Sequence, residues 1–200
     1  MPVSAVYILV VLIWSTTPLG IVWSSESVNP MMAVLLRMIM AVAFGWVAVK
    51  TLSIKVPWHA KALRLYCYSC VGIFGGLLFA YLASSYLPSG VMSLVFGLAP
   101  LLSGVLSQKI LNEDPLSWVR KLALLIALMG LAIVMSDNLA LGNDSLPGLI
   151  FILLGTFFFS LSGVLVKSIK LTINPMATTV GGLTVALPLF FLSWLILDGT

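Results

Sequence analysis

Seven long apolar runs constrain this chain more than any other feature of its sequence. They cover approximately residues 4–24, 31–49, 65–83, 90–111, 119–136, 147–166 and 176–197. A helix needs about 20 mostly apolar residues to cross the hydrocarbon core of a bilayer. The runs are continuous and not alternating, which favours helices over the strands of a membrane barrel. Only 8% of the residues are charged, far fewer than in a soluble globular domain. The sequence therefore predicts an all-α, polytopic bundle of seven transmembrane helices.

Positive charges fall in alternate loops, which predicts how the bundle sits in the membrane. The loops after the second, fourth and sixth runs carry or adjoin Lys50, Lys55, Lys61, Arg64, Lys109, Arg120, Lys121, Lys167 and Lys170. The positive-inside rule places these loops and the N-terminus in the cytoplasm. Residues 137–146, which contain two aspartates, are then external. The first run has no basic segment before it and no small-residue cleavage site, so we expect it to be retained as a span. The net charge of +4 reflects this topology, and no nucleic-acid partner is expected.

Arg37 is the one basic residue that lies more than two residues inside an apolar run; Lys109, Arg120 and Lys121 lie at run ends. A charged side chain within a span either extends to the membrane surface or faces a polar space inside the bundle. The second interpretation is favoured, because extension would bring Arg37 to the external face that the other basic residues avoid. On this hypothesis Arg37 faces the bundle interior together with Ala33, Val34, Met40, Ala41 and Phe44.

Two parts of the chain resemble each other at an offset of 145 residues. Asn29-Pro30-Met31 then aligns with Asn174-Pro175-Met176, Ser15 with Ser160, and Trp14 with Phe159. Because five spans separate the copies, the second copy crosses the membrane in the opposite direction. Inverted repeats are typical of secondary transporters, whose substrate site lies where the repeats meet. We expect a first repeat over residues 4–136 and the first two helices of a second over 147–200.

Helix interruptions within the spans are the best pointers to such a site. Pro18 cannot donate a hydrogen bond to the carbonyl of Trp14, and Gly163 aligns with Pro18 in the second copy. Pro100 interrupts the fourth run. Hydroxyl groups lie next to Pro18 and Gly163, where they could bind a substrate. The alternative is that these hydroxyls only donate to carbonyl groups of their own helix. Small residues at Gly72, Gly76 and Ala80 predict a close helix–helix contact.

Catalysis is not supported by the residues present. The lone histidine, His59, lies in a predicted cytoplasmic loop, out of reach of the serines inside the spans, so a serine protease lacks its base. No cluster of His, Asp or Glu lies within the spans to hold a metal. Cys67 and Cys70 have no second ligand pair and are interpreted as small apolar residues. The chain is expected to be no enzyme and to use no cofactor.

The runs also resemble a known family. "LIWSTTPLGIVWSSESVNPMMAVLLRMIMA" is similar to the start of the EamA family of the drug/metabolite transporter superfamily, with its Trp in the first span and Arg in the second. "YLASSYLPSGVMSLVFGLAPLLSGVLSQKILNEDPLSWVRKLALLIALMGLAIVM" resembles its third to fifth spans, with Pro100 and Glu113 at family positions. "LPGLIFILLGTFFFSLSGVLVKSIKLTINPMATTVGGL" is similar to the opening of its second repeat.

The resemblance implies ten helices in two inverted repeats and export or exchange of metabolites, amino acids or drugs. This chain shows seven of the ten, so the alternatives are a carrier in the cytoplasmic (inner) membrane, a carrier completed by a homodimer partner or another chain, and a truncated, non-transporting half-bundle.

For a carrier, we expect Arg37 to attract an anionic group of the solute. Trp14 and Tyr81 would pack on its apolar part, and Ser15, Thr17 and Ser160 would form hydrogen bonds. All six acidic residues lie at or beyond the span ends, which predicts an exchanger or facilitator without a proton-coupling acid in these helices.

Overall fold

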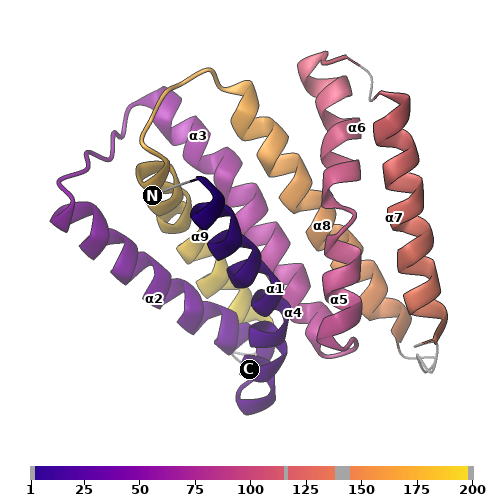
Figure 1. Ribbon diagram of the computed structural model, residues 1–200. Coiled ribbons are helices and arrows are strands. Elements are labelled where there is room, and N and C mark those ends of the chain that lie inside the picture. The colour runs from indigo at the N-terminus through magenta and orange to yellow at the C-terminus, as the bar shows by residue number, and fades with distance from the viewer. Residues whose placement is uncertain (1–2, 115–116, 138–144, 198–200) are drawn as a thin grey trace.

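The chain folds as a bundle of helices in the computed structural model (Figure 1). The structure describes residues 3–114, 117–137 and 145–197, and in this part of the chain every regular element is helical. The elements are α1 (Val3–Ser27), α2 (Pro30–Thr51), α3 (Ala60–Cys70), the π-helix η1 (Val71–Gly76), α4 (Leu77–Ser84), α5 (Ser89–Phe96), α6 (Ala99–Leu111), α7 (Trp118–Asp137), α8 (Ser145–Ser168) and α9 (Pro175–Leu197).

Each predicted apolar run forms helix over nearly its predicted length, which confirms a polytopic helical membrane protein. Within the described residues, six segments are long and apolar enough to cross a membrane: Tyr7–Glu26, Pro30–Thr51, Ala60–Ser84, Ser89–Leu111, Ser145–Ser168 and Pro175–Leu197. The remaining run, 119–136, is also helical as α7. It is not one of those six segments, and its crossing of the membrane stays a prediction.

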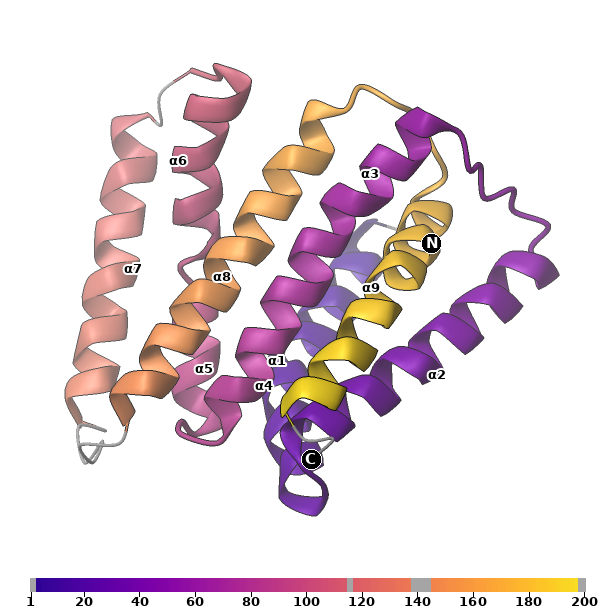
Figure 2. The ribbon, with the colours of Figure 1, turned by 180° about the vertical axis from the view of Figure 1, so that it is seen from behind.

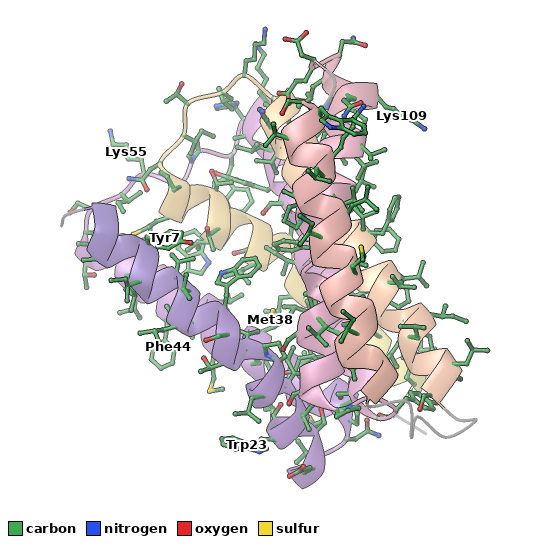
Figure 3. All side chains as sticks on the ribbon, turned by 45° about the vertical axis from the view of Figure 1, so that its right-hand side comes forward. Tyr7, Trp23, Met38, Phe44, Lys55 and Lys109 are labelled. Carbon is green, nitrogen blue, oxygen red and sulfur yellow. The ribbon has the colours of Figure 1, made fainter. Side chains whose placement is uncertain are left out.

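The connections alternate between the two ends of the bundle, as successive crossings require. The loop from α8 to α9, the start of α3 and the end of α6 lie at the upper end in Figure 1, and the loop from α2 to α3 rises to this end along the left side. Figure 3 shows Lys55 and Lys109 at this same end and Trp23 at the other. The basic loops thus share one end of the molecule. Part of the predicted external loop, residues 138–144, lies outside the described residues.

The Asn-Pro-Met repeat has a local structural cause. Asn29 Oδ1 accepts a hydrogen bond from the Met31 amide at 3.1 Å, and Asn174 Oδ1 accepts one from the Met176 amide at 2.9 Å. Each asparagine is therefore the N-cap of a helix whose first residue is proline, a position where the missing N–H costs nothing. The helices that they begin, α2 and α9, pack against each other and run in opposite directions (Figure 1).

The centre of the bundle is α8 packed against the third span, which runs through α3, η1 and α4. Figure 2 shows these segments side by side, with α2 and α9 to one side and α5, α6 and α7 to the other. The predicted small-residue contact is confirmed. A Cβ added at Gly72 would lie 2.5 Å from the Cβ of Ser162, and one added at Gly155 would lie 3.0 Å from the Gly76 carbonyl oxygen. Small residues thus allow the two backbones to approach closely.

The third span was expected to be a plain α-helix, but Val71–Gly76 forms a π-helix. Single π turns inside α-helices are uncommon and often occur at functional sites. At this junction the Ser162 hydroxyl donates to the carbonyl of Tyr68 at 2.7 Å. A side chain of α8 therefore supplies a donor to the third span where its helical hydrogen-bonding pattern changes.

Of the three predicted interruptions, one coincides with an actual break in a helix. The fourth span divides into α5 and α6 at Gly97 and Leu98, and Pro100 lies in the first turn of α6. By contrast, α1 continues through Pro18 and α8 continues through Gly163. Proline at position 18 removes one hydrogen bond without ending the helix, as membrane helices commonly tolerate.

Candidate functional site: a cavity between two inverted segments

A cavity of about 770 Å³ lies between α1, the third span, the break in the fourth span and α8. This volume is within the range of sites that take small organic molecules. Eighteen residues line it: Trp14, Ser15, Thr17, Pro18, Ile21, Ser69, Gly72, Ile73, Gly76, Leu77, Ser93, Phe96, Gly97, Ser103, Phe159, Ser162, Gly163 and Val166. The two unusual segments of the bundle, η1 and the Gly97–Leu98 break, both contribute to its walls.

The contributions of α1 and α8 match position by position. From α1 the lining residues include positions 14, 17, 18 and 21, and from α8 they are positions 159, 162, 163 and 166. Each pair is separated by the same 145 residues that relate the two copies of the sequence. Positions spaced by 3, 4 and 7 lie on one face of a helix. The same face of each copy is therefore turned toward the cavity, and the two helices run in opposite directions (Figure 1).

Aromatic rings mark the place where the two copies meet. Trp14 and Phe159 occupy equivalent positions, and their rings contact edge to face with centroids 5.2 Å apart. Phe96, next to the break in the fourth span, contacts Phe159 in the same manner at 6.3 Å. Aromatic pairs in this geometry are favourable beyond their buried area. Two positions that the 145-residue offset makes equivalent therefore meet in the wall of the cavity.

Hydroxyl groups supply the polar part of the lining. Ser15 donates to the Leu12 carbonyl at 3.0 Å, Thr17 to the Ile13 carbonyl at 2.7 Å, and Ser93 to the Ser89 carbonyl at 2.8 Å. In each of these bonds the hydroxyl donates to a carbonyl of its own helix, which is the alternative that the sequence left open. Each hydroxyl oxygen can still accept a hydrogen bond from another group. Back-bonding and a place in the cavity wall occur together at these positions.

The structure does not bring Arg37 to this cavity. Its side chain is half-buried, and it is not one of the lining residues. Two residues on the helical face predicted to be internal are exposed, Met40 at 54% and Phe44 at 71%; Figure 3 shows Phe44 on the outside of α2. In the part of the chain that the structure describes, Arg37 forms no hydrogen bond or ion pair. Arg37 therefore lies at the border between the packed and the exposed faces of α2.

Three other predicted positions, Tyr81, Ser160 and Pro100, also lie outside the lining. Tyr81 is 1% exposed, and its hydroxyl lies 3.3 Å from that of Ser24. Ser160 is 1% exposed and donates to the Ala99 carbonyl at 3.1 Å. This bond ties α8 to the first turn of α6. Burial and specific partners give these side chains structural roles.

The sequence signals for the missed residues were present but incomplete. Ser162 could have been found by applying the 145-residue offset to Thr17, because the two positions are equivalent. Phe96 and Gly97 lie within four residues of the predicted interruption at Pro100. Gly72 and Ile73 had no such signal, since they reach the cavity through a π turn that the sequence did not predict.

The described residues contain no group of three or more His, Cys, Asp or Glu that could hold a metal ion. His59 serves as the N-cap of α3, with its Nδ1 accepting from the Ala62 amide at 3.3 Å. Cys67 and Cys70 are free thiols. Among the described residues that line the cavity, none is acidic, basic or a histidine.

A comparison with protein families gives one match: the family described as the EamA-like transporter family matches residues 2–136. No curated protein and no solved structure matches the chain. The matched region extends through α1 to α7 apart from the last residue of α7, and it includes both α1 and the fourth-span walls of the cavity.

Proposed function

Because this chain belongs to the EamA-like transporter family, we propose that it is a secondary carrier that exports or exchanges a small organic solute across the cytoplasmic membrane. The family consists of membrane transporters, not enzymes, and the apolar helices make the chain a multi-pass membrane protein. The observation that carries the proposal is the cavity lined by equivalent faces of two inverted segments. Such a space can open toward either side by related movements, as alternating access requires.

The described lining residues of the cavity include no acidic side chain that could couple transport to protons. A facilitator or exchanger, in which the solute gradient or a counter-solute supplies the energy, is the simplest carrier of this kind. A homodimer partner or a second chain that completes the bundle is compatible with this proposal. A non-transporting half-bundle is the alternative that the following experiment excludes or supports.

The test fills the cavity without disturbing the packing. A Cβ at Gly163 meets no heavy atom within 4 Å, and Gly163 lines the cavity. Gly163→Trp should therefore occupy the space with an indole ring and leave the bundle intact. Gly20 on α1 also has open space around it and does not line the cavity, so Gly20→Trp is the matched control.

Cells that express the chain should differ from vector-only cells in the extracellular amount of at least one metabolite, measured by mass spectrometry of the medium. Gly163→Trp should abolish that difference and Gly20→Trp should keep it, at equal amounts of each protein in the membrane. An unchanged difference with Gly163→Trp would refute the cavity as the transport site. No difference between wild type and vector would favour the non-transporting alternative.

A further inference from the structure

The cavity is uncharged although it lies in a bundle with free charges at its ends. None of the lining residues that the structure describes is Asp, Glu, Lys, Arg or His. An ion that entered such a space would lose its hydration without meeting an opposite charge, which is strongly unfavourable. A neutral solute does not incur this penalty. The lining therefore discriminates against ions of either sign.

The hydrogen-bonding groups of the lining are biased toward acceptors. Six lining residues carry a hydroxyl group, and four of these hydroxyls already donate to a backbone carbonyl. Their oxygens can still accept. The Trp14 carbonyl adds an acceptor, because Pro18 four residues later has no N–H to offer it. The donors in the described lining that are not already used are the hydroxyls of Ser69 and Ser103 and the indole N–H of Trp14.

A solute that needs donors from the wall beyond the hydroxyls of Ser69 and Ser103 and the Trp14 N–H would have to break the existing bonds of the other four hydroxyls. Those bonds measure 2.7–3.0 Å, and breaking them removes part of the gain from binding. A solute that donates its own N–H or O–H to the hydroxyl oxygens leaves them intact. The rings of Trp14, Phe96 and Phe159 meanwhile offer faces and edges to a planar apolar body.

We propose that the cavity selects an uncharged, planar apolar solute that donates at least one hydrogen bond. This inference rests on the proposed function and names the substrate class of the same site. It replaces the anionic solute that the position of Arg37 in the sequence suggested, since Arg37 does not line the cavity.

Four probes built on one ring separate the contributions of charge and donor. Indole is neutral with an N–H donor, 1-methylindole is neutral without a donor, indole-3-acetate is an anion, and tryptamine is a cation. Binding is measured by equilibrium filtration on the full chain in lipid nanodiscs, with empty nanodiscs subtracted to remove partition into lipid. Indole should bind at least tenfold more tightly than each of the other three. 1-Methylindole leaves the acceptors of the cavity without a hydrogen-bond donor, and the two ions bring a charge that the lining does not neutralise.

A matched pair of variants locates the effect in the cavity. Thr17 lines the cavity and donates to the Ile13 carbonyl, whereas the adjacent Thr16 forms the same kind of bond, is exposed and does not line it. Thr17→Val keeps the shape and removes the acceptor oxygen, so it should weaken indole binding several-fold and leave 1-methylindole unchanged. Thr16→Val should change neither.

Equal affinity for indole and 1-methylindole, tighter binding of either ion, or no measurable binding of any probe would each overturn this inference. None of these results tests the proposed function. That function is tested by the metabolite comparison between wild type, Gly163→Trp and Gly20→Trp. A carrier that fails the indole test but passes the metabolite test transports a solute of a different class.

Discussion

The ion pair between Lys167 and Glu113 joins the end of α8 to the segment that follows α6. The hydrogen bond and charge of Lys167, aided by a hydrogen bond from Ser107, lower the pKa of the Glu113 carboxyl below its ordinary value of 4.5. A depressed pKa means that the pair stabilises the fold above about pH 4.5. That contribution is lost as the pH falls through the lower folded-state pKa. Both side chains are substantially exposed, so the effect on overall stability is small.

The pKa of Glu113 gives a direct check on this contact. In protein with ¹³C-labelled glutamate, NMR titration should show the Glu113 carboxyl titrating below 4.5. Lys167→Ala should raise the pKa of Glu113 toward 4.5 because its largest cause is removed. Glu26 is the other glutamate of the chain, so its single resonance can be told apart from that of Glu113 by the Glu113→Gln variant. Identical Glu113 titrations in wild type and variant would show that the pair does not form in the membrane.

Individual side chains were the hardest features to predict from the sequence. Trp14, Ser15 and Thr17 do line the cavity, because one helical face places them together. Ser160 aligns with Ser15 but donates to the Ala99 carbonyl instead. The difference arises because α6 packs against α8. A sequence pattern gives the helical face of a residue, whereas its partner depends on which other helix packs there.

Helical elements, by contrast, follow almost directly from composition. Continuous apolar runs fix each span to within a few residues, since unpaired backbone groups are too costly in lipid for any other structure. The two asparagine caps add an exact start to α2 and α9. The π turn in the third span could not be read from spacing, because small residues at every fourth position suit an α-helix equally well. Packing against Phe158 and Ser162 of α8 accompanies the change.

Contact between η1 and α8 predicts a strong effect of one added methyl group. Gly72→Ala would place a Cβ 2.5 Å from the Cβ of Ser162, and neither atom belongs to a flexible side-chain end. Overpacking of this kind costs about 1–3 kcal/mol. We expect a lower thermal unfolding midpoint, measured by tryptophan fluorescence in detergent, and a partial loss of the Ser162 bond to the third span.

Gly20→Ala is the control for this change, because a Cβ there meets nothing within 4 Å. Alanine is the better helix former, by about 1 kcal/mol, so the control should leave the midpoint unchanged or raise it. Equal midpoints for Gly72→Ala and Gly20→Ala would contradict the close approach of η1 and α8.

At the scale of the whole molecule, the charge pattern predicts an orientation that thiol labelling can test. Lys55 lies in the α2–α3 loop at the basic end, and Val28 lies between α1 and α2 at the opposite end. In a background with both native cysteines replaced, an impermeant maleimide should label Val28→Cys in intact cells. Lys55→Cys should react only after permeabilisation.

Both positions are exposed, with Val28 at 42%, so a lack of labelling cannot be attributed to burial. A third variant, Thr172→Cys in the α8–α9 loop, should behave like Lys55→Cys because an odd number of further crossings separates it from Val28. Labelling of all three in intact cells, or the reverse pattern, would refute an N-terminus in the cytoplasm.

The contact between Trp14 and Phe159 has a consequence for the origin of this bundle. If the two segments descend from one ancestral helix pair that assembled with an upside-down copy of itself, this position faced its own duplicate. A charged side chain would have repelled that duplicate, whereas an aromatic ring can present its edge to the face of an identical ring. Only after gene duplication could the two positions diverge, one becoming tryptophan and the other phenylalanine. In any bundle assembled in this manner, the position where the two copies meet is therefore expected to be uncharged.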